Sequence, residues 1–153
     1  AAERMDFLRI NDLKNTWGEL RFDTALIRAP RSAAWGLAAA LRTEWADVRH
    51  LAVAASLRDD AAAAEIADEQ FKETDTARAQ EILAAMEHGL LMGSSSESVL
   101  ADPRRTLYLP VTYPVVDRLC LSDQPFMGLR GARHLEEALW NGSVLRRELS
   151  VRA

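Results

Sequence analysis

Cysteine is almost missing from this chain of 153 residues, in which Cys120 is the only one. A disulfide needs two cysteines, and an iron–sulfur cluster or a structural zinc site needs several thiolates, so the chain by itself can supply none of these. The lack of a disulfide framework is typical of a reducing compartment, and we expect a cytoplasmic protein.

Long hydrophobic runs are missing too. No stretch approaches the roughly 20 apolar residues of a membrane span, and the opening AAERMDFLRI lacks the apolar centre of a signal peptide. The chain does not begin with methionine and starts inside a helical pattern, so we expect a fragment. Residues 1–18 are predicted to be a leading helix that continues from an upstream domain, and residues 19–153 a single α/β domain.

Basic residues are outnumbered, with 19 Lys and Arg against 23 Asp and Glu, a net charge of −4 and no basic stripe. This composition disfavours a nucleic-acid surface. The three histidines, His50, His88 and His134, lie far apart, and none has a partner four residues away, so a role as metal ligands is also disfavoured. A hydrophobic content of 48% suits a globular domain with a real core.

Short apolar runs bounded by turn residues alternate with helical patterns along the chain. Buried parallel strands have this appearance, and four are expected, at residues 24–27, 51–54, 90–92 and 106–109. A short further strand is expected at 70–72. We therefore predict a three-layer α/β domain, Rossmann-like or flavodoxin-like, with a mostly parallel sheet.

Helices are expected between these strands. The predicted ranges are 32–45 with Ser32 as N-cap, 58–68, 74–87, and a tail from Gly128 that Asn141-Gly142 kinks or ends. The amides of Ala33 and Ala34 are expected to face the end of the first strand. The final helix should bury Leu135 and Leu139 on the sheet and leave Arg130, Arg133 and Glu137 outside.

The loops at 28–32, 93–97 and 113–120 each follow a strand, and parallel strands end on the same side. We therefore expect the three loops to converge on one edge, where open α/β sheets bind ligands. Ser94 to Ser96 can cap the following helix, and Glu97 suits its first turn. Because no GxSxG pattern or His–Asp relay accompanies these serines, a turn and cap is favoured over a nucleophile.

Six residues at this edge are candidates for contacting an anion. Gly93, Ser94 and Ser95 offer amides and hydroxyls, while Arg28, Arg31 and Arg118 offer positive charge. The alternative is that the arginines only pair with Asp23, Glu97 or Asp117. No catalytic residue and no metal ligand is predicted.

Three segments, GLLMGSSSESVL, LPVTYPVVDRLCL and PFMGLRGARHLEEAL, resemble the C-terminal domain of nitrogenase component-1-type subunits. That domain shows a strand followed by Gly-Asn/Ser-Ser, an sFPvfDR loop and a GyrGa entry into a final helix. The upstream run RFDTALIRAPRSAAWGLAAAL resembles the start of the same domain. Asp117-Arg118 is more similar to the β-type dinitrogenase subunit or its cofactor-scaffold relative than to the α-type. Chlorophyllide-reductase-like subunits share the PFMG..GA pattern.

The resemblance implies a domain of an ATP-driven, multi-electron oxidoreductase of the nitrogen-fixation type, which walls the cluster or substrate cavity. It implies two partners, a homologous α-type subunit and a separate ATP-dependent reductase. An iron–sulfur cluster would belong to the parent complex, since Cys120 does not match the family's cluster-binding cysteines. The loop from Val111 to Arg118 also lacks the cofactor-binding histidine of the α-type. We expect the isolated chain to be inactive.

Two other functions stay open. One is a stand-alone α/β module that binds a small anion at its helix N-termini, and the other is an interaction domain without catalysis. The full open reading frame discriminates between them and the nitrogenase-like hypothesis. Cysteine-containing sequence upstream would support the resemblance, and a start codon at Ala1 would contradict it.

Overall fold

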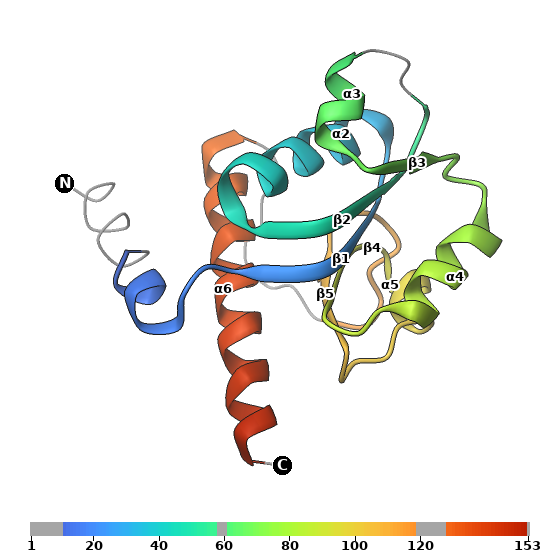
Figure 1. The fold of residues 1–153 in the computed structure, drawn as a ribbon. Helices are drawn as coiled ribbons and strands as arrows, with labels where there is room; N and C mark the ends of the chain where they lie inside the picture. The colour runs from blue at the N-terminus through green and yellow to red at the C-terminus, as the bar shows by residue number, and fades with distance from the viewer. Residues whose placement is uncertain (1–10, 58–60, 119–127, 153) are drawn as a thin grey trace.

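The computed structural model describes residues 11–57, 61–118 and 128–152, which form a parallel sheet between helices (Figure 1). The sheet order is β3-β2-β1-β4-β5. The strands are β1 (Arg21–Arg28), β2 (Asp47–Ala54), β3 (Glu69–Phe71), β4 (Gly89–Gly93) and β5 (Thr106–Pro110). The helices are α2 (Arg31–Ala40) with a π-helical turn, η1 (Leu41–Trp45), then α3 (Ala61–Ile66), α4 (Thr76–Ala85), α5 (Ser95–Ser98) and α6 (Gly128–Arg152).

The predicted α/β fold is confirmed, because all neighbouring strands pair in parallel and every predicted strand is present. Ala25 of β1 lies between Leu51 of β2 and Leu90 of β4, and Leu90 in turn pairs with Leu107 of β5. The short strand expected at 70–72 is β3, shifted by one residue and paired with β2 at the sheet's edge.

The sheet is covered on both faces, which gives three layers (Figure 1). On one face Ile27, Val53 and Met92 pack with residues of α2 and α6 in the larger core. Leu26 and Leu91, which neighbour them along the strands, point to the other face and pack against α4. Alternate residues of these strands therefore face opposite layers, and both are apolar because both layers are buried.

Several predicted boundaries are corrected by the structure. The predicted N-cap Ser32 is wrong, because α2 begins at Arg31 behind Pro30, whose carbonyl accepts the first helical hydrogen bond from the Ala34 amide at 2.9 Å. The Ala34 amide is therefore not free to face the end of β1. The second strand begins at Asp47, before the predicted apolar run, and α4 spans only Thr76–Ala85, with Asp75 as its side-chain cap.

The expected break at Asn141-Gly142 is also wrong, since α6 runs unbroken to Arg152. Gly142 serves close packing: a Cβ atom there would lie 2.6 Å from Cδ1 of Leu107 on β5. The remaining predictions for this helix are confirmed. Leu135 and Leu139 are buried, and the side chains of Arg130, Arg133 and Glu137 are exposed.

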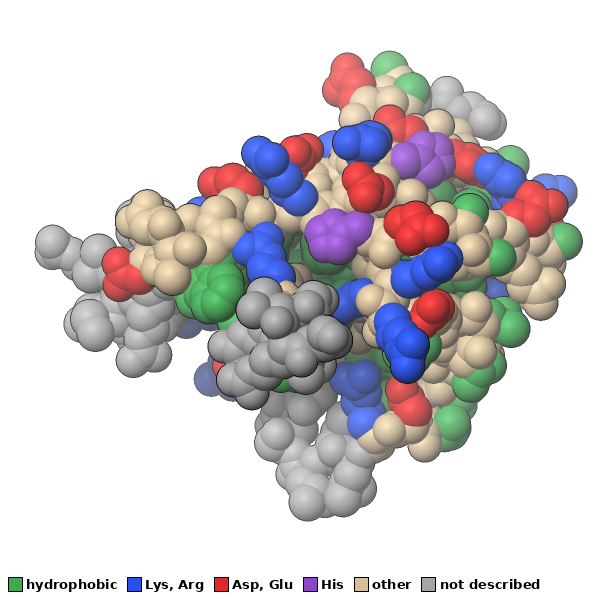
Figure 2. Space-filling view, turned by 60° about the horizontal axis from the view of Figure 1, so that its bottom comes forward, with side chains coloured by type: hydrophobic (Ala, Val, Ile, Leu, Met, Phe, Trp, Pro, Cys, Tyr) green, Lys and Arg blue, Asp and Glu red, His purple; other side chains and the backbone are tan. Residues whose placement is uncertain are grey.

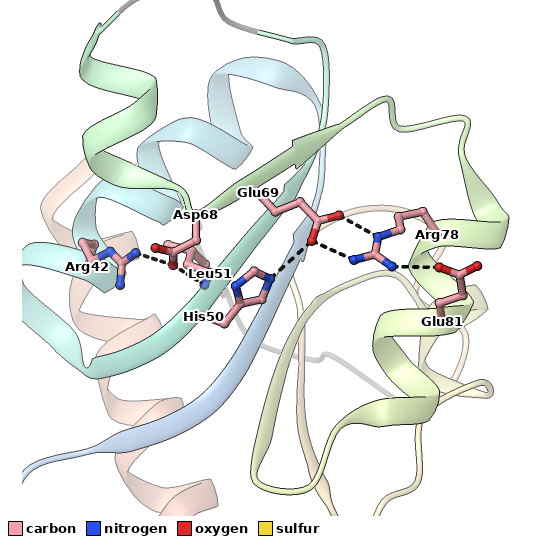
Figure 3. Close-up of polar contacts among 7 residues, drawn as sticks. All are labelled: Arg42, His50, Leu51, Asp68, Glu69, Arg78 and Glu81. Carbon is pink, nitrogen blue, oxygen red and sulfur yellow. Dashed lines mark hydrogen bonds and ion pairs between the residues drawn. The ribbon is translucent and has the colours of Figure 1, made fainter.

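A chain of polar contacts attaches the short edge strand β3 to β2 and α4 (Figure 3). The Glu69 carboxylate accepts hydrogen bonds from Nε and Nη2 of Arg78 at 2.6 and 3.0 Å, and His50 Nε2 lies 3.3 Å from it. Arg78 also donates to Glu81 at 2.7 Å. Such bidentate contacts fix geometry as well as charge, which compensates for the few backbone bonds of a three-residue strand.

Asp68, just before β3, makes a second attachment (Figure 3). Its Oδ2 accepts from the Leu51 amide at 2.8 Å and from Arg42 Nη2 at 2.5 Å. Arg42 also donates to the carbonyl oxygens of Val48 and Ile66. The guanidinium of Arg42 thus ties the π-helical turn to the strand layer beside it.

Residues 11–17 are helical, as expected for the second half of the leading segment, and the helix ends at Gly18, which has φ +77°. Positive φ favours glycine because it has no Cβ atom. Within the described part of the chain, no helix combines the length and apolar character that crossing a membrane requires.

Candidate functional site

The candidate site lies where β1 and β4 end side by side. After β1, the strands β2 and β3 are added on one side of β1, and β4 then lies on its other side. This reversal of strand order is the topological switch point at which open α/β sheets form a ligand crevice. Arg28 is the last residue of β1, and Gly93 is the last residue of β4.

The Arg28 side chain turns into this switch point instead of toward solvent. Its Nη1 lies 3.1 Å from Oε1 of Glu97, and the two side chains are only 17% and 8% exposed. Its Nη2 donates to the Glu73 carbonyl at 2.7 Å. The pairing with Glu97 was one of the three alternatives that the sequence left open, and it commits the Arg28 charge to the protein itself.

Glu97 is held in place by a capping box. The Ser94 amide donates to Glu97 Oε2 at 2.7 Å, the Ser94 hydroxyl donates to the same oxygen, and Ser94 caps α5, as predicted. Gly93 makes room for this arrangement, because a Cβ atom there would lie 3.1 Å from Glu97 Oε2. The carboxylate is thus buried with an ionic partner and two hydrogen-bond donors, as a buried charge requires.

Ser95 joins the α5 turn to the loop after β5. Its amide donates to the Pro114 carbonyl at 2.9 Å, and its hydroxyl donates to Asp117 Oδ1 at 2.6 Å while accepting from the Val116 amide at 2.9 Å. The predicted convergence of the three loops on one edge is therefore confirmed for residues 28–32, 93–97 and 113–118. The rest of the third loop lies outside the described residues.

Arg118 lies beyond this junction. Its guanidinium carbon is 5.4 Å from the centre of the Tyr108 ring, and its Nη2 is 4.0 Å from Asp117 Oδ2. Burial raises the pKa of Tyr108, although the neighbouring Ser95 side chain acts in the opposite direction. Arg118 keeps a side-chain exposure of 39%, so its charge is available at the surface.

The six candidate residues therefore fall into two groups. Arg28, Gly93, Ser94 and Ser95 build the edge, and the amides of Ser94, Ser95 and Ser96 already have acceptors within the protein. Arg31, in the first turn of α2, and Arg118 are the ones that present charge outward. Chemically, this edge can position a negatively charged surface or ligand beside two arginines; its described residues include no histidine.

The described residues offer no grouped ligands for a resident metal ion. Among residues 11–57, 61–118 and 128–152, no three His, Cys, Asp or Glu side chains are grouped so that they could hold a metal ion. Cys120 lies outside the described residues. With one thiol in the whole sequence, the donor set of an iron–sulfur cluster is incomplete.

Two parts of the site were missed by sequence reasoning. Glu97 was expected in a helix turn and as one possible arginine partner, but its capping box with Ser94 was not predicted, although the Ser94–Glu97 spacing could have indicated it. The Tyr108 ring beneath Arg118 had no local signal, because their contact depends on how the loop folds back over β5.

The comparisons with known proteins add no relative. No protein-family model, no curated protein and no solved structure matches the chain.

Proposed function

We propose that this chain is a domain of a nitrogenase-like iron–sulfur reductase subunit. In the parent complex, an ATP-dependent reductase would deliver electrons for a multi-electron reduction, and this domain would wall the cluster or substrate cavity and contact a homologous α-type subunit. The proposal rests on the resemblance of the ordered motifs, and one observation of the structure supports it.

That observation is the junction at Ser95. The GSSSE turn and the PVVDR loop are separate in the sequence, yet Ser95 binds Pro114, Val116 and Asp117 directly. A third resembling segment, RFDTALIRAPRSAAWGLAAAL, supplies Arg28 to the same edge. Parallel strands already bring the loops to one edge, and the direct Ser95 contacts between the two motifs are the additional feature that a single structural unit would show.

The residues at this edge are suited to line a cluster or substrate cavity. Arg28, Ser94 and Glu97 fix its backbone through buried charge-assisted contacts, so the wall would be preorganised before any ligand arrives. Arg31 and Arg118 would present positive charge to an anionic cluster or substrate. Because the chain lacks the thiolates for a cluster, we place the cluster on other parts of the complex and assign this chain no step of the reaction.

A subunit contact at the same edge is supported by exposed apolar side chains. Tyr113 and Val116, in the loop that Ser95 holds, are 87% and 79% exposed. Aromatic side chains are enriched in protein interfaces, so a loop that displays Tyr113 beside Val116 suits such a contact. The loop would therefore face the α-type subunit.

The coding sequence around this chain gives the first test. We expect it to continue upstream into a domain with several cysteines, and an open reading frame that starts at Ala1 would contradict the proposal. The second test is anaerobic reconstitution of the purified chain with iron and sulfide, followed by metal analysis and visible absorption. Without the parent complex, we expect no stoichiometric iron, for wild type and Cys120→Ser alike. Stoichiometric iron that survives Cys120→Ser would refute the assignment of the cluster to other chains.

A further inference from the structure

A cavity lies at the opposite end of the sheet from the candidate site. Its volume is about 580 Å³. Phe22 lines it near the start of β1, His88 just before β4, and Leu107 near the start of β5, so it opens at the amino ends of the strands. The size lies within the usual range for small-molecule sites, about 300–1,000 Å³. Nothing in the proposed function uses this end of the domain.

The charged lining of the cavity is unbalanced. Its described lining contains Arg21, Arg104, Arg146 and Arg147 and a single acidic side chain, Glu87, which pairs with Arg105 at 3.1 Å. Figure 2 looks toward this end of the molecule and shows a histidine near the centre of the face, with basic and acidic side chains intermingled around it.

The two arginines from α6 are held by backbone oxygens. Arg146 donates to the Arg104 carbonyl at 2.6 Å, and Arg147 donates to the Trp17 carbonyl. Neither Arg104 nor Arg147 pairs with a carboxylate of the described residues. Burial lowers the pKa of Arg146, because a guanidinium removed from water loses hydration. A bound anion would give Arg104 and Arg147 a counter-charge.

Part of the cavity lining is apolar and includes stacked rings. Trp17, Leu20 and Leu107 line it, and the rings of Phe22 and His88 stack with centroids 5.8 Å apart and planes at 27°. Ser143 lies one helical turn before Arg146 and Arg147, and its buried hydroxyl has no hydrogen-bond partner among the described residues. A buried hydroxyl without a partner is costly, and a ligand oxygen would satisfy it.

We propose that this cavity binds a small organic anion with an apolar ring. Its phosphate or carboxylate group would contact Arg104 and Arg147, with Ser143 as an additional donor, and its ring would lie against Trp17 and Phe22. The guanidinium groups match phosphate and carboxylate equally well, since both anions accept two parallel hydrogen bonds. The surrounding apolar surface would select against a bare inorganic ion.

Calorimetric titration of the chain with three probes tests each part of this proposal. The probes are 1-naphthyl phosphate, which has both features, inorganic phosphate, which has only the charge, and 1-naphthol, which has only the ring. We expect 1-naphthyl phosphate to bind at least about tenfold tighter than either of the others, and 1-naphthoate to behave like it. Equal binding of inorganic phosphate would refute the role of the ring, and equal binding of 1-naphthol would refute the role of the arginines.

Matched double variants locate the site. Arg104→Gln/Arg147→Gln is expected to weaken 1-naphthyl phosphate binding at least about tenfold, whereas Arg49→Gln/Arg130→Gln, which removes the same charge from exposed positions, should change it less than about twofold. The same loss in both variants would mean that only net charge matters and would overturn the proposal. Chemical-shift mapping on the wild-type chain tests it without any variant: shifts are expected around residues 20–22, 107 and 143–147. Shifts confined to residues 93–97 would place the ligand at the other edge and overturn it.

Discussion

Arg28 and Glu97 form a nearly buried ion pair, with Nη1 and Oε1 3.1 Å apart, across the switch point between β1 and β4. Arg28 also reaches the carbonyl of Glu73, and Glu97 also holds Ser94, so the pair links three segments that are distant in sequence. The crevice in which related folds place a ligand is therefore closed here by the protein's own charges. The arginines that remain available to a partner or ligand are those farther out on the edge.

Removing one member of this pair should strongly destabilise the fold. Glu97→Ala leaves the Arg28 guanidinium buried without its counter-charge, and we expect the free energy of unfolding to fall by about 3–5 kcal/mol. Urea denaturation followed by circular dichroism measures this change. The double variant Arg28→Met/Glu97→Ala should cost less than Glu97→Ala alone, because it leaves no unpaired charge.

Asp23→Ala provides the matched control. It removes a carboxylate 3.7 Å from Arg49, but these side chains are 50% and 83% exposed, so the expected cost is below about 1 kcal/mol. If Glu97→Ala cost no more than Asp23→Ala, the Arg28–Glu97 contact would have no special structural role.

Stability should also depend on pH through Glu69. Hydrogen bonds from Arg78 hold the pKa of Glu69 below its usual value of 4.5, although burial acts in the opposite direction. The unfolded chain therefore binds a proton at higher pH than the folded chain does. The resulting stability is present above the unfolded pKa and is lost as the pH falls through the folded pKa.

Urea titrations between about pH 6 and pH 3 test this expectation. The difference in unfolding free energy between wild type and Glu69→Gln should shrink as the pH falls. The exposed Glu65→Gln serves as the control for replacing a glutamate by glutamine. A constant gap between wild type and Glu69→Gln would show that the Arg78 contact does not favour the ionised carboxylate.

The strands and their parallel direction could be predicted because each strand has a local signal in the sequence. Runs such as Leu90-Leu91-Met92 are apolar on both sides, which only a sheet covered on both faces explains, and alternation with helices then requires parallel strands. The meeting of the loops followed from that geometry alone. The cap of α5 could be predicted for the same reason, since the Ser94–Glu97 spacing lies within one turn of the chain.

The features that could not be predicted depend on contacts between distant segments. In the sequence, Gly142 is typical of a helix end. In the structure it lies within α6, where the lack of a Cβ atom lets Leu107 of β5 pack close to the helix. The cavity at the amino ends of the strands combines Trp17, His88, Arg104 and Arg147, which share no local pattern. The partner of Arg28 was likewise one of three alternatives until the turn after β4 was placed.

The final helix should depend on Leu135 for its attachment to the sheet. Leu135 is 2% exposed in the larger core, so Leu135→Ala is expected to lower the free energy of unfolding by about 2–5 kcal/mol. Leu129→Ala, on the same helix, is the control, because Leu129 is 66% exposed and should change stability by less than about 0.5 kcal/mol. Equal effects in denaturant titrations would mean that the buried face of α6 is assigned wrongly.

Two glycines should respond in opposite directions to the same substitution. A Cβ atom would meet nothing within 4 Å at either Gly18 or Gly36, so sterics with neighbours play no part. Gly36 lies inside α2 with helical backbone, where alanine restricts the unfolded chain and favours the helix. We expect Gly36→Ala to raise the free energy of unfolding by about 0.5–1 kcal/mol.

Gly18 differs only in its backbone conformation. Its φ of +77° lies in the left-handed region, where a Cβ atom approaches the backbone carbonyl, so Gly18→Ala should lower the free energy of unfolding by about 1–2 kcal/mol. Thermal and urea unfolding of the two variants beside wild type measure both signs in one experiment. A stabilising Gly18→Ala would show that the leading helix does not end in this conformation in solution. In that case the Trp17 carbonyl, which Arg147 binds, would also be placed differently.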